Sequence, residues 1–189
     1  MKQRARNDED KAGRVGAILD AARQLWDESS YGEFTVGAVA ERAGIVKGTV
    51  FLYFPTKERL LFAVFESYLD EYFDAVDGAL AKQRRRWPAA AASEVLFTCF
   101  SEPLLRLLPI AAPVLEKNVD DRVASTLRHE LDERLAFTGK LLEKRLRCND
   151  GATLMRRALA LATGLAASVL RIDLQREFVE MMTAMLTEG

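Results

Sequence analysis

Apolar residues recur at intervals of three and four along most of the chain, which is the spacing of one face of an α-helix. The clearest run lies within residues 35–57, where Val36, Val39, Ala40 and Ala43 occupy positions i, i+3, i+4 and i+7. Strand-like alternation is absent, and the chain holds only 5 prolines in 189 residues. The pattern therefore predicts an all-α protein.

Four helices are expected before residue 83, and their ends carry recognisable signals. Thr35 is a good N-cap for the second helix, and Thr56 is one for the fourth. Gly44 follows the second helix, where the chain needs a positive φ that glycine adopts without a Cβ penalty. Pro55 prevents the third helix from continuing. The expected ranges are about 11–28, 36–43, 47–54 and 57–81.

The segment before the first helix, residues 1–10, has mixed charge, and we expect it to be a mobile arm. A solvated tail is the simpler interpretation of this arm. The alternative is that Lys2, Arg4 and Arg6 reach along a groove of DNA.

The second half of the chain gives weaker signals. Residues 83–88 are expected to form a turn in which Arg84 to Arg86 are solvated. Three prolines are expected to break the stretch after residue 100 into short helical pieces. Asp173 is the expected cap of the last helix. The other expected helices span about 89–100, 121–147 and 153–170, and the three prolines are Pro103, Pro109 and Pro113.

Three spaced motifs give the first half a more specific meaning. They read AERAG at 40–44, KGT at 47–49 and YFPTKE at 53–58. Together they resemble the DNA-binding domain of the tetracycline-repressor (TetR) family of bacterial transcription regulators. The resemblance covers residues 15–61, about a quarter of the chain.

This resemblance implies a fold and a division into parts. The implied fold is all-α with about nine helices, in which a three-helix helix-turn-helix DNA-binding domain is followed by a helical domain for effector binding and dimerisation. The implied ranges are 1–56 for the helix-turn-helix domain, 57–82 for a connecting fourth helix and 83–189 for the C-terminal domain.

The resemblance also implies which residues contact double-stranded operator DNA. Lys47 can reach guanine O6 and N7 or a phosphate, and Gly48 lets the backbone come close to DNA. A lysine in the first turn of a helix opposes the helix macrodipole, so an anion such as phosphate is expected beside Lys57. A solvated surface lysine is the alternative there. The full set is Thr35, Lys47, Gly48, Thr49, Leu52, Tyr53 and Lys57.

Three positions depart from the family pattern. Val46 stands where a small polar N-cap is usual and cannot cap the third helix, a loss of about 1 kcal/mol. Phe51 stands where tyrosine is usual, which removes one expected phosphate bond. Ser30 replaces the usual glycine before Tyr31, and Gly32 is expected to take over its positive φ.

The charge of the chain constrains how it can bind DNA. The formal net charge is −1, and residues 1–60 hold 10 Lys and Arg against 9 Asp and Glu. Proteins that coat nucleic acid through bulk charge are strongly basic. Contact must therefore depend on local placement of charge, and binding is expected to be selective for a site.

The helix expected at 153–170 is apolar on most faces, so it needs covering on two sides. The resemblance implies that the last two helices, about 153–187, form the interface of a homodimer. The alternative is a helix at the centre of a monomer core. A dimer would place two recognition helices on a two-fold axis, where they read a palindrome.

The resemblance further implies a pocket for a small-molecule effector of unknown identity among the middle helices. Five residues could line it or could be ordinary core: Trp87, Phe97, Phe100, Phe137 and Met155. No cofactor or metal site is expected, because His129 is the only histidine and the carboxylates form no ligand cluster.

These observations favour a ligand-responsive transcription regulator, a repressor released from its operator by a small molecule. The alternative is a DNA-binding dimer with no small effector, controlled by a protein partner or constitutive. An enzyme is not supported, because no catalytic set or phosphate loop is found.

Composition sets the expected location. The N-terminus is too polar for a secretory signal, and the longest apolar run, 158–170, is too short to span a bilayer. A bacterial cytoplasmic protein, associated with the nucleoid when bound to DNA, is expected.

The two cysteines, Cys99 and Cys148, are expected to be free buried thiols, with a redox switch as the alternative.

Overall fold

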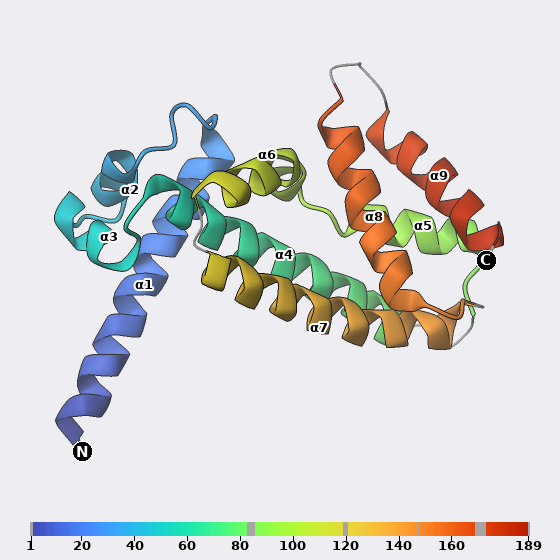
Figure 1. Cartoon of the computed structure of the whole chain (residues 1–189), viewed down its shortest axis with the longest axis horizontal. Coiled ribbons are helices and arrows are strands. Elements are labelled where there is room, and N and C mark those ends of the chain that lie inside the picture. The colour runs from blue at the N-terminus through green and yellow to red at the C-terminus, as the bar shows by residue number, and fades with distance from the viewer. Residues whose placement is uncertain (1, 83–85, 119–120, 147, 169–172, 189) are drawn as a thin grey trace. The chain divides into compact units, whose positions relative to one another are not determined.

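The computed structural model describes residues 2–82, 86–118, 121–146, 148–168 and 173–188. Within these residues every regular element is an α-helix, and nine helices follow one another (Figure 1). They are α1 Lys2–Glu28, α2 Val36–Arg42, α3 Lys47–Tyr53, α4 Lys57–Lys82, α5 Ala89–Thr98, α6 Glu102–Asn118, α7 Asp121–Arg145, α8 Gly151–Ala166 and α9 Leu174–Glu188. The prediction of an all-α protein with about nine helices is confirmed.

The capping signals read from the sequence are confirmed where they fall on described residues. The Thr56 side chain accepts a hydrogen bond from the Arg59 backbone N–H at 3.1 Å, and Asp173 accepts one from Arg176 at 3.1 Å. Asp150, expected in a turn, caps α8, which therefore begins two residues earlier than expected. Arg84, Arg85 and residues 169–170 of the predicted elements lie outside the described residues.

The first helix is longer than expected, because α1 begins at Lys2 rather than near Lys11. Residues 2–12 hold no proline or glycine, and lysine, arginine and alanine, which propagate a helix readily, make up much of the segment. The expected start of the first helix near Lys11 is therefore wrong, and mobility of residues 1–10 stays a prediction. The side chains of Lys2, Arg4 and Arg6 lie outside the described part, so their groove contact stays a prediction.

The expected break in the third quarter of the chain is also wrong, because α6 runs unbroken through Pro109 and Pro113. Pro103 lies in the first turn, where the N–H has no partner within the helix. The two inner prolines each remove one backbone hydrogen bond. Four apolar side chains of this helix are buried, and their burial offsets that loss: Leu104, Leu107, Leu108 and Ala111.

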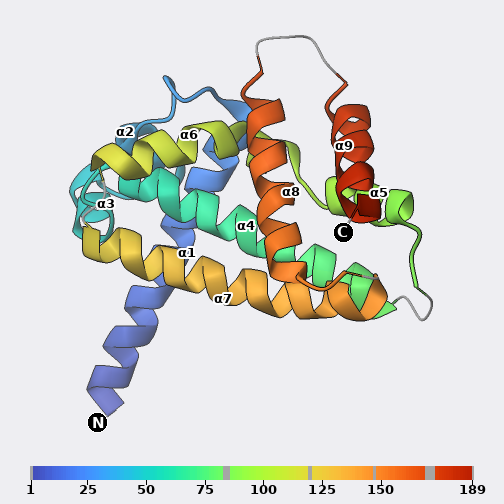
Figure 2. The ribbon, with the colours of Figure 1, turned by 45° about the vertical axis from the view of Figure 1, so that its right-hand side comes forward.

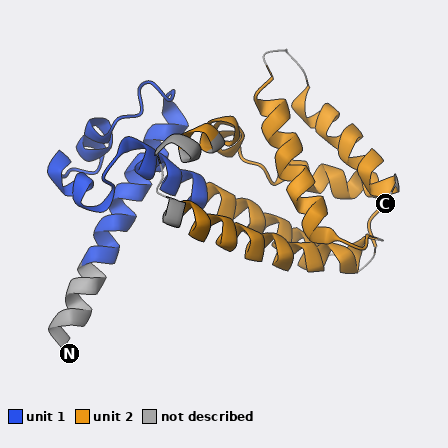
Figure 3. Ribbon diagram, viewed as in Figure 1, with its two compact units in different colours: residues 1–67 blue, residues 68–189 orange. Residues whose placement is uncertain are grey.

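The chain divides into two compact units, residues 1–67 and 68–189, and the division falls within α4 (Figure 3). The first unit holds α1, α2, α3 and the start of α4. The second unit holds the remainder of α4 and α5 to α9. A separate connecting part at 57–82 stays a prediction.

Aromatic and small apolar side chains form the core of the first unit. Trp26 of α1 packs edge-on against Phe34, with ring centroids 6.1 Å apart. Ile18, Val39 and Val50 are completely buried, so α1, α2 and α3 each contribute to this core. On its surface, Arg42 of α2 forms an ion pair of 2.6 Å with Glu28 at the end of α1, which lowers the pKa of that carboxyl group.

The loop between α1 and α2 closes in a way that the sequence did not indicate. Gly44, which lies between α2 and α3 and not in this loop, has a φ of 66° as expected. It is the only residue with positive φ in the described part of the chain. The expected positive φ at Gly32 is therefore wrong. The loop is instead held by Ser30, whose backbone N–H and hydroxyl both donate to Glu33 Oε2, at 2.9 and 2.7 Å. The Ser30 hydroxyl supplies one hydrogen bond that a glycine could not.

In the second unit, a polar cluster joins α7 to the end of α4, and the two helices run side by side (Figure 2). Arg134 of α7 forms ion pairs with Asp74 and, at 3.0 Å, with Asp77 of α4. The Thr138 hydroxyl donates to Asp77 at 2.7 Å. Thr138 is completely buried, so its hydrogen bond satisfies a group that would otherwise lack a partner.

Two glycines let α7 and α8 cross in direct backbone contact. A Cβ added to Gly139 would lie 2.8 Å from the Cα of Ala152, and one added to Gly151 would lie 2.8 Å from the Cα of Gly139. Both atoms that would be struck belong to backbone, which cannot rotate away. Glycine is therefore required at both positions by the packing of the helices.

We expect Gly139→Ala to lower the free energy of unfolding by about 1–3 kcal/mol, the usual cost of forcing extra volume into a packed interior. Urea denaturation at a fixed protein concentration measures the change. Gly78→Ala in α4 is the matched control, because a Cβ there meets nothing within 4 Å. The control should raise stability through helix propensity, and an equal gain from Gly139→Ala would contradict the described crossing.

Candidate nucleic-acid interface

The short helices α2 and α3 are stabilised by different interactions, a side-chain cap for α2 and a buried side chain for α3. Thr35 caps α2, because its hydroxyl oxygen accepts a hydrogen bond from the Ala38 backbone N–H at 3.1 Å. Val46 precedes α3 and makes no side-chain capping bond, as the sequence predicted. The buried Val50 side chain is therefore the main attachment of α3 to the unit.

Anchoring α3 through Val50 leaves the opposite face of the helix in solvent. Lys47, Gly48, Phe51 and Leu52 are exposed, while Thr49 and Tyr53 are half-buried at its edges. The Lys47 ammonium lies 5.6 Å from the centre of the Phe51 ring. The structure thus brings the predicted residues of α3 to one accessible face and its borders.

Gly48 is not needed by the fold. A Cβ built at this position meets no atom within 4 Å, and its φ is not positive. Glycine inside a helix costs about 1 kcal/mol relative to alanine. Because Gly48 also lies on the exposed face of α3, its bare backbone leaves room for the close approach of another molecule.

Lys57 has a contact that the sequence did not reveal. Its ammonium group donates to the backbone carbonyl of Tyr31 at 2.5 Å and lies 3.9 Å from the centre of the Tyr31 ring. Burial lowers the pKa of Lys57 below its usual value. The lysine therefore ties the start of α4 to the loop between α1 and α2, and it is not freely solvated.

This tie was missed because its partners are separated by 26 positions in the chain. No local spacing rule joins an ammonium group to a backbone carbonyl over that distance. The contact is compatible with a second role for Lys57, since an ammonium group has three donors and a phosphate could take one of them.

A cluster of aromatic rings lies in the second unit and includes two of the predicted effector residues. Tyr72 of α4 stacks on Phe100, with ring centroids 4.1 Å apart. Phe97 of α5 lies 5.4 Å from Phe178 of α9 and 6.4 Å from Phe100. The cluster thus joins α4, α5 and α9 through ring contacts.

The other predicted effector residues are placed differently. Met155 of α8 is completely buried. Phe137 of α7 is 56% exposed and has its ring 5.7 Å from the Arg134 guanidinium group. It takes no part in the ring contacts around Phe100, and its role in effector binding stays a prediction.

The Tyr72 hydroxyl group is buried and has no hydrogen-bond partner among the described residues. Burial raises the pKa of Tyr72 well above its usual value, and the neighbouring Cys99 adds to the effect. The group is therefore a protonated donor in an apolar place. A buried donor without a partner costs about 1–3 kcal/mol, so such groups usually serve a water or a ligand.

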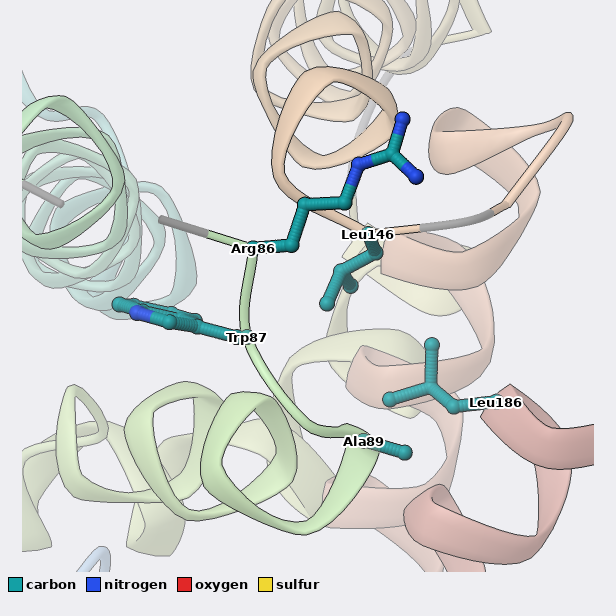
Figure 4. Close-up of a pocket in the computed structure, with 5 residues that line it drawn as sticks. All are labelled: Arg86, Trp87, Ala89, Leu146 and Leu186. Carbon is teal, nitrogen blue, oxygen red and sulfur yellow. The ribbon is translucent and has the colours of Figure 1, made fainter. Parts of the chain in front are cut away.

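A half-open cavity of about 210 Å³ lies elsewhere in the second unit, and Figure 4 shows its lining. Leu146 and Leu186 turn their side chains toward its centre, and Arg86 extends past Leu146. Trp87, predicted as a pocket residue, lines this cavity and not the aromatic cluster. Ala89 completes the wall.

Among the described residues, no group of three or more His, Cys, Asp and Glu side chains is arranged to hold a metal ion. His129 is exposed and lies 3.6 Å from Glu133. No helix in the described ranges is long and apolar enough to cross a membrane. Cys99 and Cys148 are free thiols whose pKa is raised by burial.

Comparison with known proteins decides the family. A family model described as bacterial regulatory proteins of the tetR family matches residues 18–64, and one described as the tetracyclin repressor-like C-terminal domain matches residues 66–184. The chain belongs to the TetR family. It is a DNA-binding transcription regulator, and members of the family generally act as dimers with small-molecule effectors.

Individual TetR-family proteins show how far the similarity extends. The fatty acid metabolism regulator of Bacillus subtilis is 32% identical over 60 residues, which are 32% of this chain and 31% of that protein. The matched segment thus spans about a third of that relative.

Two solved structures match over nearly their whole length. The Thermus thermophilus repressor FadR in complex with lauroyl-CoA is 26% identical, with 93% of this chain and 94% of that chain covered and a TM-score of 0.64. A TetR-family regulator from Streptomyces coelicolor is 23% identical, with 93% and 98% covered and a TM-score of 0.61.

We expect Gly48→Ala to raise the stability of the protein by about 0.5–1 kcal/mol and to weaken DNA binding roughly tenfold. The added methyl group strengthens the helix but fills the space through which the backbone would approach DNA. Thermal unfolding and fluorescence anisotropy measure the two effects. Gly78→Ala should give the first effect without the second, and unchanged DNA binding by Gly48→Ala would exclude a close approach.

Proposed function

We propose that this TetR-family protein is a repressor that binds a palindromic operator as a homodimer and is released by a small molecule. The observation that carries the proposal is the exposed face of α3, where Gly48 leaves the backbone uncovered with no reason in the fold. Thr49 and Tyr53 border this face and would supply further contacts, as would Thr35 at the start of α2. Lys47 and Lys57 would supply the positive charge.

The described surface of α8 and α9 supports the homodimer. Ala158 and Ala162 of α8 are buried in their own unit, whereas Leu161 and Leu165 remain half-buried and Gly164 is exposed. Met181 of α9 is 43% exposed. Small and apolar residues that stay accessible on the last two helices fit a second copy of the chain, as predicted for about 153–187.

A dimer would also allow a chain of almost no net charge to bind DNA. A net charge of −1 gives little general attraction to DNA. One recognition helix reads only a few base pairs, whereas two on a two-fold axis read both halves of a palindrome and combine their affinities.

The aromatic cluster of the second unit is our proposed location for the effector. The unpartnered Tyr72 hydroxyl would donate to an acceptor on the ligand, and the rings of Phe97 and Phe100 would contact its apolar part. The complex of the Thermus thermophilus repressor with lauroyl-CoA supports an acyl compound as the first candidate. The alternative function is a DNA-binding dimer that has no small effector, for which the same hydroxyl would meet a buried water.

Selection of bound sequences from random DNA, followed by release assays with lauroyl-CoA and with laurate, tests the proposal. We expect an inverted repeat bound by two subunits per site and a loss of binding when one of these compounds is added. Asymmetric selected sites would contradict the homodimer. If the protein stays bound to DNA in the presence of both compounds, neither acts as its effector. That result would favour the DNA-binding dimer that has no small effector.

We expect Lys57→Ala to weaken binding to all DNA sequences and to lower the slope of log affinity against log salt by about one unit for each bound subunit. The reason is that each Lys57 would neutralise one phosphate. Lys140→Ala removes the same charge from the exposed surface of α7 and should change neither quantity. A lower melting temperature with an unchanged salt slope would restrict Lys57 to holding the Tyr31 loop.

A further inference from the structure

Exposed apolar side chains gather at the recognition helix. In the described part of the chain, the large hydrophobic residues in solvent are Tyr31, Val46, Phe51, Leu52, Phe137 and Met181. Three of these lie within seven consecutive residues. Leu52 is 81% exposed, Val46 is 73% exposed and Phe51 is 41% exposed. We call the side chains of Val46, Phe51 and Leu52 the apolar tip of α3.

The fold of the first unit does not account for the apolar tip. Val50 already anchors α3 and is completely buried. Leu52 is almost fully in water, so a polar residue would serve the folded unit equally well. Single exposed hydrophobic residues are common and need no explanation, but a group of them on one short element marks a surface that meets a partner.

The positions of the tip residues define the shape of that surface. Leu52 follows Gly48 by four residues, so the leucine side chain lies beside the uncovered backbone on one face of the helix. Phe51 follows Lys47 by four residues, and the lysine ammonium group lies over its ring at 5.6 Å. The face therefore offers an apolar contact next to an open space, with one cation along its edge.

The major groove of DNA contains one apolar group that such a surface can recognise. Base edges there present hydrogen-bond donors and acceptors, except for the C5-methyl group of thymine. Leu52 and Phe51 have no polar side-chain atom with which to read a donor or an acceptor. Contact with a methyl group is the form of direct readout open to them.

We propose that Leu52 reads the C5-methyl group of a thymine in each operator half-site, with the exposed Phe51 next to it in the chain. The inference rests on the proposed function, because it requires that α3 enters the major groove. It adds a specificity that Lys47 alone does not give. Operator half-sites should contain thymine at the base pair that Leu52 covers, in place of the guanine that a cationic or polar side chain would favour there.

Deoxyuridine substitution tests the contact, since uracil differs from thymine only by the missing methyl group. Each thymine of the selected operator is replaced in turn, and affinity is measured for the full-length dimer at one salt concentration. At one position per half-site, wild-type affinity should fall roughly fourfold for each methyl group removed. Leu52→Ala should bind the thymine and uracil operators equally well.

Leu52→Met is the matched control, because it keeps an apolar side chain of similar volume at the same exposed position. This variant should retain the preference for thymine over uracil. Circular dichroism shows whether each variant is folded, and Leu52 makes no buried contact that Leu52→Ala would remove.

Three results would overturn the inference. If no single uracil replacement lowers wild-type affinity, the apolar tip reads no methyl group, although operator binding itself stands. If Leu52→Ala keeps the full preference for thymine, another residue reads it. If Leu52→Ala instead changes the oligomeric state of the free protein, the tip is a protein contact.

A failure to select any sequence is a different outcome, because it would reject the proposed function together with this inference.

Discussion

The burial of one valine, Val50, is the constraint on which the recognition surface depends. A helix of seven residues is not stable alone in water, because nucleation is unfavourable and too few hydrogen bonds follow. With no side-chain cap at Val46, α3 persists because Val50 is completely buried and the helix packs against α2. The same attachment fixes which residues face outward, so core packing decides what the helix can present to DNA.

The second unit relies on contacts of a different kind. Arg134, Thr138 and Asp77 join α7 to α4 through polar groups, and the Gly139–Gly151 contact joins α7 to α8 through backbone. Both depend on exact positions and tolerate little change in volume or charge. The aromatic cluster around Phe100 is held by ring packing, and its directional element is the buried hydroxyl group of Tyr72.

The sequence predicted features whose causes are local and missed those whose causes are distant. The bounds of α2 and α3, the caps at Thr35 and Thr56 and the positive φ of Gly44 follow from neighbouring residues. The unbroken α6 was missed because burial of its apolar face outweighs two prolines. The contact of Lys57 with Tyr31 and the glycine crossing could not be predicted, because each joins residues that no sequence pattern links.

The exposure of the apolar tip also has a consequence for the protein in solution. A net charge of −1 provides little repulsion between copies, so contacts between exposed Leu52 and Phe51 side chains are weakly opposed. DNA that covered α3 would shield this surface. The colloidal stability of the protein is then coupled to occupancy: the molecules without DNA are the ones that aggregate first.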